Sequence, residues 1–221
     1  IWKDAEKVFQ DYPETNRNFS LAGLSFTNIK EMVPRMLNGN IEGSIRISNI
    51  IAGLKDYSRD RKNKANIEID INKVINFSIS ILNKQIKDFT NSFNLKLGKN
   101  LPVAKGDPQQ IEQVIINIIQ NSLYALPDKS SGVCVSSLFD KKLDTLKIII
   151  MDEGIGIKKE TLNRIIEPFF TTRVDSGGTG LGLYISHSII KEHHGSLDIE
   201  SEPGKGTEVC ITLPVSGRGD E

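Results

Sequence analysis

The chain has 221 residues, of which 38% are hydrophobic and 25% are charged. This composition predicts one large or two small folded domains and excludes a wholly disordered chain. The 28 basic and 28 acidic residues give a formal net charge of zero, which argues against nucleic-acid or membrane-surface binding driven by bulk charge. No apolar run reaches the roughly 18 residues that a membrane-spanning helix needs.

The two cysteines, Cys134 and Cys210, lie in apolar, strand-like runs. Neither has another cysteine or a histidine at metal-ligand spacing, so we expect two buried, reduced thiols. Reduced thiols are typical of the cytoplasm, which is the location predicted for this chain. Because the chain begins with Ile1 rather than Met, we expect it to be part of a longer protein. Whether that protein is attached to a membrane stays open.

Residues 1–63 are predicted to form a helical segment. Apolar residues in 1–10 recur at helical spacing, and residues 41–58 carry a broad apolar face formed by Ile45, Ile47, Ile50, Ile51, Leu54 and Tyr57. A helix with so wide an apolar face must bury it against other helices. We expect its partners to be the helix that ends in 1–10 and a copy of that pair in a second chain. Residues 11–39 are then an inserted segment.

From residue 64 to residue 215 the pattern changes to short strands and helices. The predicted strands are 67–71, 93–97, 133–139, 143–151, 196–201 and 207–213, and the predicted helices begin after Asp70 or Asn72 and span 108 to about 125, 159–166 and 183–192. Alternation of apolar and polar residues supports the strands 67–71 and 93–97, and Asp107-Pro108 is a typical helix start. The expected inner side of the first of these helices is formed by Val74, Ile75, Ile79, Ile81 and Leu82.

These elements predict an α+β fold. It is a two-layer sandwich in which a mixed, largely antiparallel sheet carries helices on one face. Residues 216–221 are expected to fray.

Three amide side chains mark the helix after Pro108 as a candidate site. Gln113, Asn117 and Asn121 are four residues apart, so they lie on one face of an otherwise apolar helix. Buried amides need polar partners. Either the backbone supplies those partners, or Asn117 and Asn121 offer amide oxygens to Mg²⁺, which also takes triphosphate oxygens.

A carboxylate and a glycine turn extend this candidate site. Asp152 ends an apolar strand before Gly154 and Gly156, where a carboxylate can accept a hydrogen bond from an exocyclic amine; an aspartate that caps a turn is the alternative. The glycine turn 178–182 opens a helix, and unpaired N–H groups at a helix start favour phosphate. Arg173 is placed to reach a phosphate as well.

Four segments carry a family resemblance. Asn117-x-x-x-Asn121, Asp152-Glu-Gly-Ile-Gly156, Glu167-Pro-Phe-Phe-Thr-Thr172 and Gly178-Thr-Gly-Leu-Gly182 resemble the N, G1, F and G2 boxes of sensor histidine kinases, in order and at the expected separations. Those kinases belong to the ATP-binding superfamily of gyrase, Hsp90 and MutL. The resemblance covers about residues 67–214. It implies a Bergerat-type ATP-binding catalytic domain over 64–215, in a kinase of a two-component signalling system.

The resemblance also implies roles for individual residues. Asp152 would bind the adenine amine, Asn117 and Asn121 would hold Mg²⁺ and, with Arg173, act in catalysis, and residues 158–179 would form a mobile lid. The ATP-binding residues implied are Asn117, Asn121, Tyr124, Asp152, Gly154, Gly156, Ile157, Phe169, Thr179, Gly180, Leu181, Gly182, Leu183 and Thr207.

The acceptor histidine of such kinases has no counterpart in this sequence. It is followed by an acidic residue on the first helix of a dimerisation hairpin, whereas the only histidines here are His187, His193 and His194, in or just after the predicted helix 183–192. We expect the acceptor upstream of this chain, so the chain alone would not autophosphorylate. The implied partners are a second copy, through the hairpin, and the receiver domain of a response regulator.

Two other functions are weighed against this one. ATPases of the same superfamily, and related serine kinases, carry a glutamate base one turn before the metal-binding asparagine. Asn117 occupies that position here, which argues against activation of water. A non-catalytic, nucleotide-sensing dimerisation scaffold is the other alternative, and the intact boxes argue against it.

Overall fold

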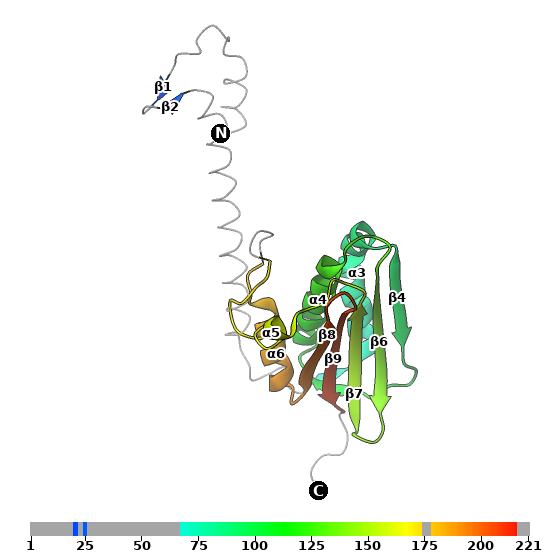
Figure 1. Cartoon of the computed structure of the whole chain (residues 1–221). Coiled ribbons are helices and arrows are strands. Elements are labelled where there is room, and N and C mark those ends of the chain that lie inside the picture. The colour runs from blue at the N-terminus through cyan, green and yellow to red at the C-terminus, as the bar shows by residue number, and fades with distance from the viewer. Residues whose placement is uncertain (1–19, 22–23, 26–66, 174–177, 216–221) are drawn as a thin grey trace. The chain divides into compact units, whose positions relative to one another are not determined.

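The computed structural model describes residues 20–21, 24–25, 67–173 and 178–215 (Figure 1). The chain divides into two units, Ile1–Leu54 and Lys55–Glu221. In the first, β1 (Ser20–Leu21) pairs antiparallel with β2 (Leu24–Ser25) inside the predicted insertion. The helices predicted in 1–10 and 41–58, the tail 216–221 and the domain boundary at 63/64 lie outside the described residues and stay predictions.

A five-stranded sheet forms one layer of the second unit. Its strand order is β4 (Ser92–Leu97), β6 (Gly132–Asp140), β7 (Thr145–Asp152), β9 (Gly206–Pro214) and β8 (Ser196–Glu202). Only β4 and β6 pair in parallel, because the chain returns between them through a helix rather than through a tight turn. A separate antiparallel pair joins β3 (Ile67–Ile69) to β5 (Ala104–Gly106). The sequence predicted neither β5 nor the parallel pairing.

Helices form the other layer. Three of them, α3 (Ile71–Phe89), α4 (Pro108–Ala125) and α6 (Gly182–Glu192), lie on one face of the sheet (Figure 1). The fourth, α5 (Lys159–Leu162), is shorter than the predicted helix 159–166. The inward residues of β7, Leu146, Ile148 and Ile150, are almost fully buried against the helices. The two-layer α+β fold predicted from the sequence is therefore confirmed.

Local capping explains where the two long helices begin. The carboxylate of Asp70 accepts a hydrogen bond from the backbone N–H of Lys73 at the start of α3. At the start of α4, the carboxylate of Asp107 accepts one from the N–H of Gln109. Each aspartate thus satisfies one of the N–H groups that a helix start leaves unpaired.

One residue of α3 is not where the sequence placed it. Ile81 is 52% exposed, whereas Leu82 is 4% exposed, so the prediction that Ile81 faces inward was wrong. Successive residues of a helix are about 100° apart. The buried stripe runs through Ser78 and Leu82, and this rotation turns Ile81 to the flank of the helix.

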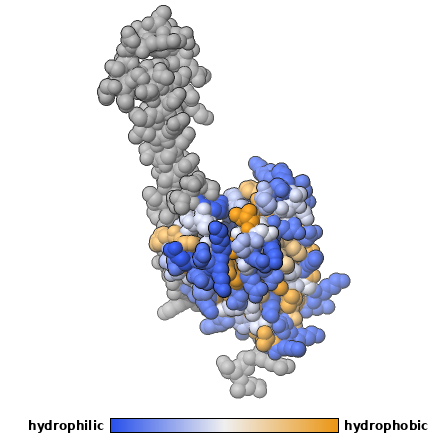
Figure 2. Space-filling model, in the orientation of Figure 1, coloured by the Kyte–Doolittle hydropathy of each residue, from blue (hydrophilic) through white to orange (hydrophobic). Residues whose placement is uncertain are grey.

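The two cysteines are free thiols, but they are partly rather than fully buried. Cys134 lies between the buried Val133 and Val135 on β6, and Cys210 has the same setting on β9. Because side chains alternate along a strand, both thiols point to the face of the sheet away from the helices. In the view of Figure 2, hydrophilic residues cover most of the surface and apolar residues form small separate patches. Within the described part of the chain, none of the helices has the length and hydropathy to span a bilayer.

His193 joins the end of α6 to the start of α4. Its Nε2 accepts a hydrogen bond from the backbone N–H of Asp107 (3.0 Å), and its Nδ1 lies 2.8 Å from the carbonyl oxygen of Ile189. An N–H can only donate and a carbonyl can only accept, so the ring is the neutral tautomer with its proton on Nδ1. The two helices are thereby held together at this end.

Replacing His193 by phenylalanine is expected to lower the free energy of unfolding by about 2 kcal/mol, because the partly buried N–H of Asp107 loses its acceptor. Denaturant unfolding of the variant and the wild type measures this difference. His194→Asn is the matched control, since His194 is exposed and has a positive φ of 57° that asparagine tolerates. Equal stability of the two variants would contradict the role of His193.

Candidate active site

Asp152, the last residue of β7, lies at the centre of the candidate site. It is only 7% exposed. Its Oδ1 accepts hydrogen bonds from the backbone N–H groups of Gly154 (3.0 Å) and Thr207 (3.1 Å). The hydroxyl of Ser122, on α4, also hydrogen-bonds to this carboxylate. Donors from β9, α4 and the loop after β7 therefore fix the orientation of one carboxylate.

Burial raises the pKa of Asp152 above its ordinary value of 3.8, although the hydrogen bonds from Ser122, Gly154 and Thr207 lower it. Burial favours the neutral form of a carboxyl group because it removes water from the charge. The folded protein therefore binds this proton more tightly than the unfolded chain does. The charged form of this buried carboxyl group therefore destabilises the fold. A residue kept in spite of such a cost is a candidate functional residue.

Stability should consequently depend on pH through Asp152. As the pH rises from about 4, the ordinary carboxyl value, through the raised pKa, the wild type loses stability relative to an Asp152→Asn variant. Above the raised pKa the difference stays constant. Denaturant unfolding of both proteins across this range measures the difference. A difference that changes in the opposite direction would mean that the fold stabilises the charged form.

Asn117 and Gly182 meet where α4 contacts the start of α6. The Nδ2 of Asn117 donates a hydrogen bond to the Oγ of Ser186 (2.9 Å). A Cβ at position 182 would collide with the Oδ1 of Asn117, so glycine permits this close approach. The amide oxygen therefore lies next to the N-terminal end of α6. No side chain caps that helix start, and its N–H groups favour an anion.

Helix α4 sets the spacing between these two contacts. Ser122 contacts Asp152, and Asn117 contacts α6. The two residues are five positions apart, which corresponds to about 7.5 Å along the helix axis. Asn121 lies between the two contacts in sequence and is exposed. One rigid helix thus contacts both a buried carboxylate and an uncapped helix start.

Arg173 packs against the same helix. Its guanidinium carbon lies 3.8 Å from the centre of the Tyr124 ring, an attractive cation–π arrangement. Tyr124 in turn meets Phe89 of α3 edge to face, with the ring centres 5.0 Å apart. Arg173 therefore packs on a residue of α4, Tyr124, that lies within one helical turn of Asn121.

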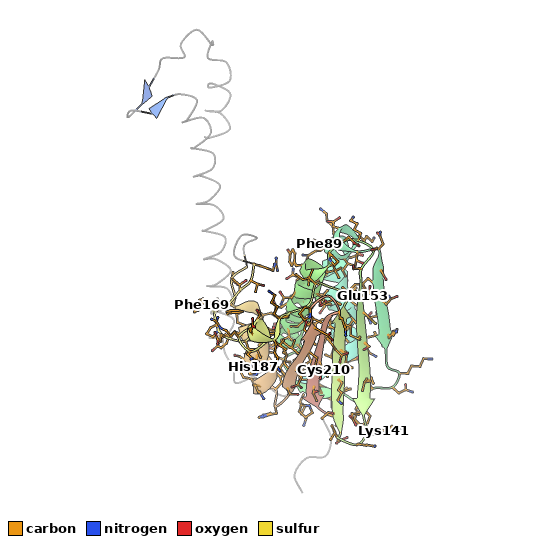
Figure 3. The ribbon with its side chains drawn as sticks, viewed as in Figure 1. Phe89, Lys141, Glu153, Phe169, His187 and Cys210 are labelled. Carbon is orange, nitrogen blue, oxygen red and sulfur yellow. The ribbon has the colours of Figure 1, made fainter. Side chains whose placement is uncertain are left out.

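The segment between α5 and α6 contacts itself through its backbone. The N–H of Phe169 donates to the carbonyl oxygen of Gly180 (3.0 Å), and the hydroxyl of Thr179 accepts from the N–H of Leu181 (3.4 Å). Phe169 is 68% exposed and lies at the edge of the domain away from the sheet (Figure 3). Leu181 is buried, and Leu183 packs against the core. Residues 174–177 of the predicted lid lie outside the described residues.

A second loop contributes backbone contacts near Asp152. The N–H of Ile157 donates to the Oγ of Ser201 (2.8 Å), which also lies 2.9 Å from the Oγ1 of Thr207. Gly156, just before Ile157, has a φ of +67° and lies against the backbone of Glu202. The loop after β7 is thereby tied to the β8–β9 hairpin.

A hollow of about 330 Å³ touches Asp152 from the sheet side. Its lining comprises Met151, Asp152, Glu200, Ser201, Glu202, Lys205, Gly206, Thr207 and Glu208. Four carboxylates and one lysine line it, and no residue of α4 or α6 takes part. The hollow is therefore poorly suited to a triphosphate.

The donor set fits a magnesium ion that is shared with phosphates. Among the described residues, no cluster of three or more histidine, cysteine, aspartate or glutamate side chains could hold a metal ion. Amide oxygens, phosphate oxygens and water are suitable ligands for Mg²⁺. Asn117 has its amide oxygen beside the start of α6, and Asn121 is exposed one turn away.

Residues 106–217 match the family described as histidine kinase-, DNA gyrase B- and HSP90-like ATPase. This match spans half of the chain. The chain belongs to this ATPase family. The family resemblance deduced from the four sequence motifs is thereby confirmed.

Relatives within this ATPase family include named kinases. The chain is 38% identical over 154 residues to Sporulation kinase E of Bacillus subtilis, covering 70% of this chain and 20% of that protein. It is 30% identical over 173 residues to Sensor histidine kinase ZraS of Klebsiella oxytoca, covering 78% of this chain and 36% of that protein. The chain thus spans a fifth to about a third of these relatives.

A solved structure shares the fold. The catalytic domain of histidine kinase ThkA aligns with a TM-score of 0.60 at 25% identity, covering 68% of this chain and 95% of that one. The alignment accounts for nearly all of that domain.

Three serines that contact residues of the candidate site were not predicted from the sequence. Ser122 contacts Asp152, Ser186 contacts Asn117, and Ser201 contacts Ile157. Ser122 and Ser186 are almost fully buried in helices that are otherwise apolar on their inner side. That interruption of an apolar stripe was the one signal that could have identified them.

Proposed function

We propose that this chain is the ATP-binding catalytic part of a protein histidine kinase in a two-component signalling system. It would bind Mg-ATP and transfer the γ-phosphoryl group to a histidine on another segment. That histidine would then pass the phosphoryl group to the receiver domain of a response regulator. One observation carries the proposal: α4 contacts the buried Asp152 carboxylate at one point and the uncapped start of α6 at another. This spacing suits an adenine base at the first point and phosphates at the second.

Each contact then has a chemical task. The Asp152 carboxylate accepts a hydrogen bond from the adenine amine, while Gly154, Gly156, Ile157 and Thr207 shape the base pocket. The N–H groups at the uncapped start of α6 meet the phosphates. Phosphoryl transfer depends mainly on such positioning and on electrostatic stabilisation.

Asn117 and Asn121 would hold the magnesium ion. When bound, Mg²⁺ neutralises charge on the phosphate oxygens. Arg173 packs on Tyr124, one turn beyond Asn121, and would add a positive charge beside the bound nucleotide. Phe169, Thr179, Leu181 and Leu183 would close the site from the lid side.

The residue at position 117 favours transfer to histidine over hydrolysis. An amide cannot accept a proton from water, and the Asn117 amide already donates to Ser186. A histidine ring is nucleophilic without a base. This feature distinguishes the chain from ATPases that carry a glutamate at this position.

The histidines of the chain itself are poor acceptors. Both ring nitrogens of His193 are engaged, and His194 follows it at the far end of α6. That helix has 11 residues, so this end lies about 16 Å from the glycine turn. His187 is half-buried on α6 (Figure 3). The acceptor is therefore proposed to lie on a dimerisation hairpin, within a homodimer, and the catalytic part is proposed to act in the cytoplasm.

Transfer of label from γ-labelled ATP tests the proposal. We would incubate this chain, with Mg²⁺, together with a longer form that extends upstream and carries Asn121→Ala, so that only the shorter chain can act on ATP. We expect label on the longer form alone, labile in acid and stable in base. The shorter, ATP-binding chain should become inactive when it carries Asn121→Ala. Asn83→Ala, on the exposed side of α3, is the matched control and should leave it active.

Other outcomes would favour the alternatives. Steady release of free phosphate with no labelled protein would indicate an ATPase. Tight ATP binding with neither labelled protein nor released phosphate would indicate a nucleotide-sensing scaffold. Sedimentation of the longer form as a monomer would contradict dimerisation through the hairpin.

A further inference from the structure

Ser186 is a buried polar residue in the apolar inner stripe of α6. It is 2% exposed and neighbours the buried Ile189 and Ile190 on that helix. Its hydroxyl accepts a hydrogen bond from the Nδ2 of Asn117, a residue 69 positions away in the sequence. A hydroxyl in such surroundings is costly unless it is hydrogen-bonded. The bond to Asn117 is therefore the feature that makes a serine suitable here.

In the structure this hydrogen bond is one of the contacts that orient the Asn117 amide, with its NH₂ group toward Ser186. An asparagine amide has an NH₂ group that donates and an oxygen that accepts, and it can rotate by half a turn to exchange them. With the NH₂ group donating to Ser186, the oxygen lies against Gly182 at the start of α6. Rotation by half a turn would place the NH₂ group there instead. An NH₂ group cannot bind a cation.

We propose that Ser186 is a positioning residue that sets the magnesium dependence of nucleotide binding by holding the oxygen of Asn117 toward the start of α6. The inference rests on the proposed function, because it assumes that Asn117 is a magnesium ligand there. Groups that orient metal ligands without touching the metal have large effects on metal affinity. Ser186 acts in this way through Asn117 alone.

The fold should survive the loss of this hydroxyl. The contact of His193 with Asp107 joins the same two helices independently, and alanine is a good helix former. A Ser186→Ala variant should therefore fold, and its thermal unfolding without nucleotide confirms that. Ser188→Ala is the matched control, because the hydroxyl of Ser188 bonds within α6, to the carbonyl oxygen of Tyr184.

The test titrates Mg²⁺ into each protein and follows binding of a fluorescent ATP analogue. For Ser186→Ala we expect the magnesium concentration at half-saturation to rise about tenfold, while binding without Mg²⁺ stays unchanged. Ser188→Ala should behave like the wild type. A Ser186→Thr variant, which keeps the hydroxyl, should restore much of the magnesium response, whereas a general loosening of the helix pair would weaken binding with and without Mg²⁺ alike.

The outcomes separate the two ideas. If the wild type binds the analogue with a magnesium dependence and Ser186→Ala shows the same dependence, only the positioning role of Ser186 is overturned. A wild type whose binding does not respond to Mg²⁺ would overturn the proposed magnesium site and the role of Ser186 with it.

Discussion

An Asp152→Asn variant is expected to bind ATP about 100-fold more weakly than the wild type, since a hydrogen bond to a charged group contributes about 1.5–3 kcal/mol. The two backbone donors, the N–H groups of Gly154 and Thr207, both point at Oδ1. The asparagine should keep its oxygen at that position, which turns its NH₂ group toward the ligand. The adenine amine then meets a donor instead of an acceptor. Calorimetric titration with ATP and Mg²⁺ measures the loss.

The same substitution should change which base is preferred. Inosine triphosphate carries an oxygen where adenine has its amine, so the NH₂ group of the variant can donate to it. We expect the ratio of ATP to inosine triphosphate affinity to fall in the variant. Asp198→Asn, on the exposed side of β8, is the control and should bind ATP like the wild type. Unchanged ATP affinity in Asp152→Asn would contradict the assignment of the base pocket.

Gly206→Ala is expected to lower the free energy of unfolding by about 3 kcal/mol, from backbone strain and from steric overlap together. Gly206 has a φ of +95° at the start of β9, a conformation that disfavours alanine. An added Cβ would collide with the carbonyl oxygen of Asp152, and that oxygen belongs to the backbone of the neighbouring strand. Because the overlap can be relieved only by moving Asp152, ATP binding should weaken as well. Denaturant unfolding and ATP titration measure the two effects.

Gly204 offers a control in the same hairpin. It also has a positive φ, of +77°, but an added Cβ would meet no atom within 4 Å. Gly204→Ala should therefore show the backbone effect alone, about 1 kcal/mol, with ATP binding intact. If both alanine variants lose the same stability, the close approach of Gly206 to Asp152 has no energetic consequence.

Much of the fold could be predicted because its signals are local. Asp70 and Asp107 cap the helices that follow them within three residues, and the apolar run 148–151 predicts the strand β7. The four motifs are short as well, so their order and separation identified the family. The roles of the site residues stay a prediction.

The identity and the approximate bounds of these elements were thus determined by the sequence itself. Only the tertiary structure decided the partners: the Oγ of Ser186 for Asn117, the ring of Tyr124 for Arg173, and the parallel pairing of β4 with β6. Each partner is far away in the chain, and its choice depends on how two elements pack. Periodicity and capping report only on neighbours within a turn or two, so they carry no information about which distant surface an element will meet.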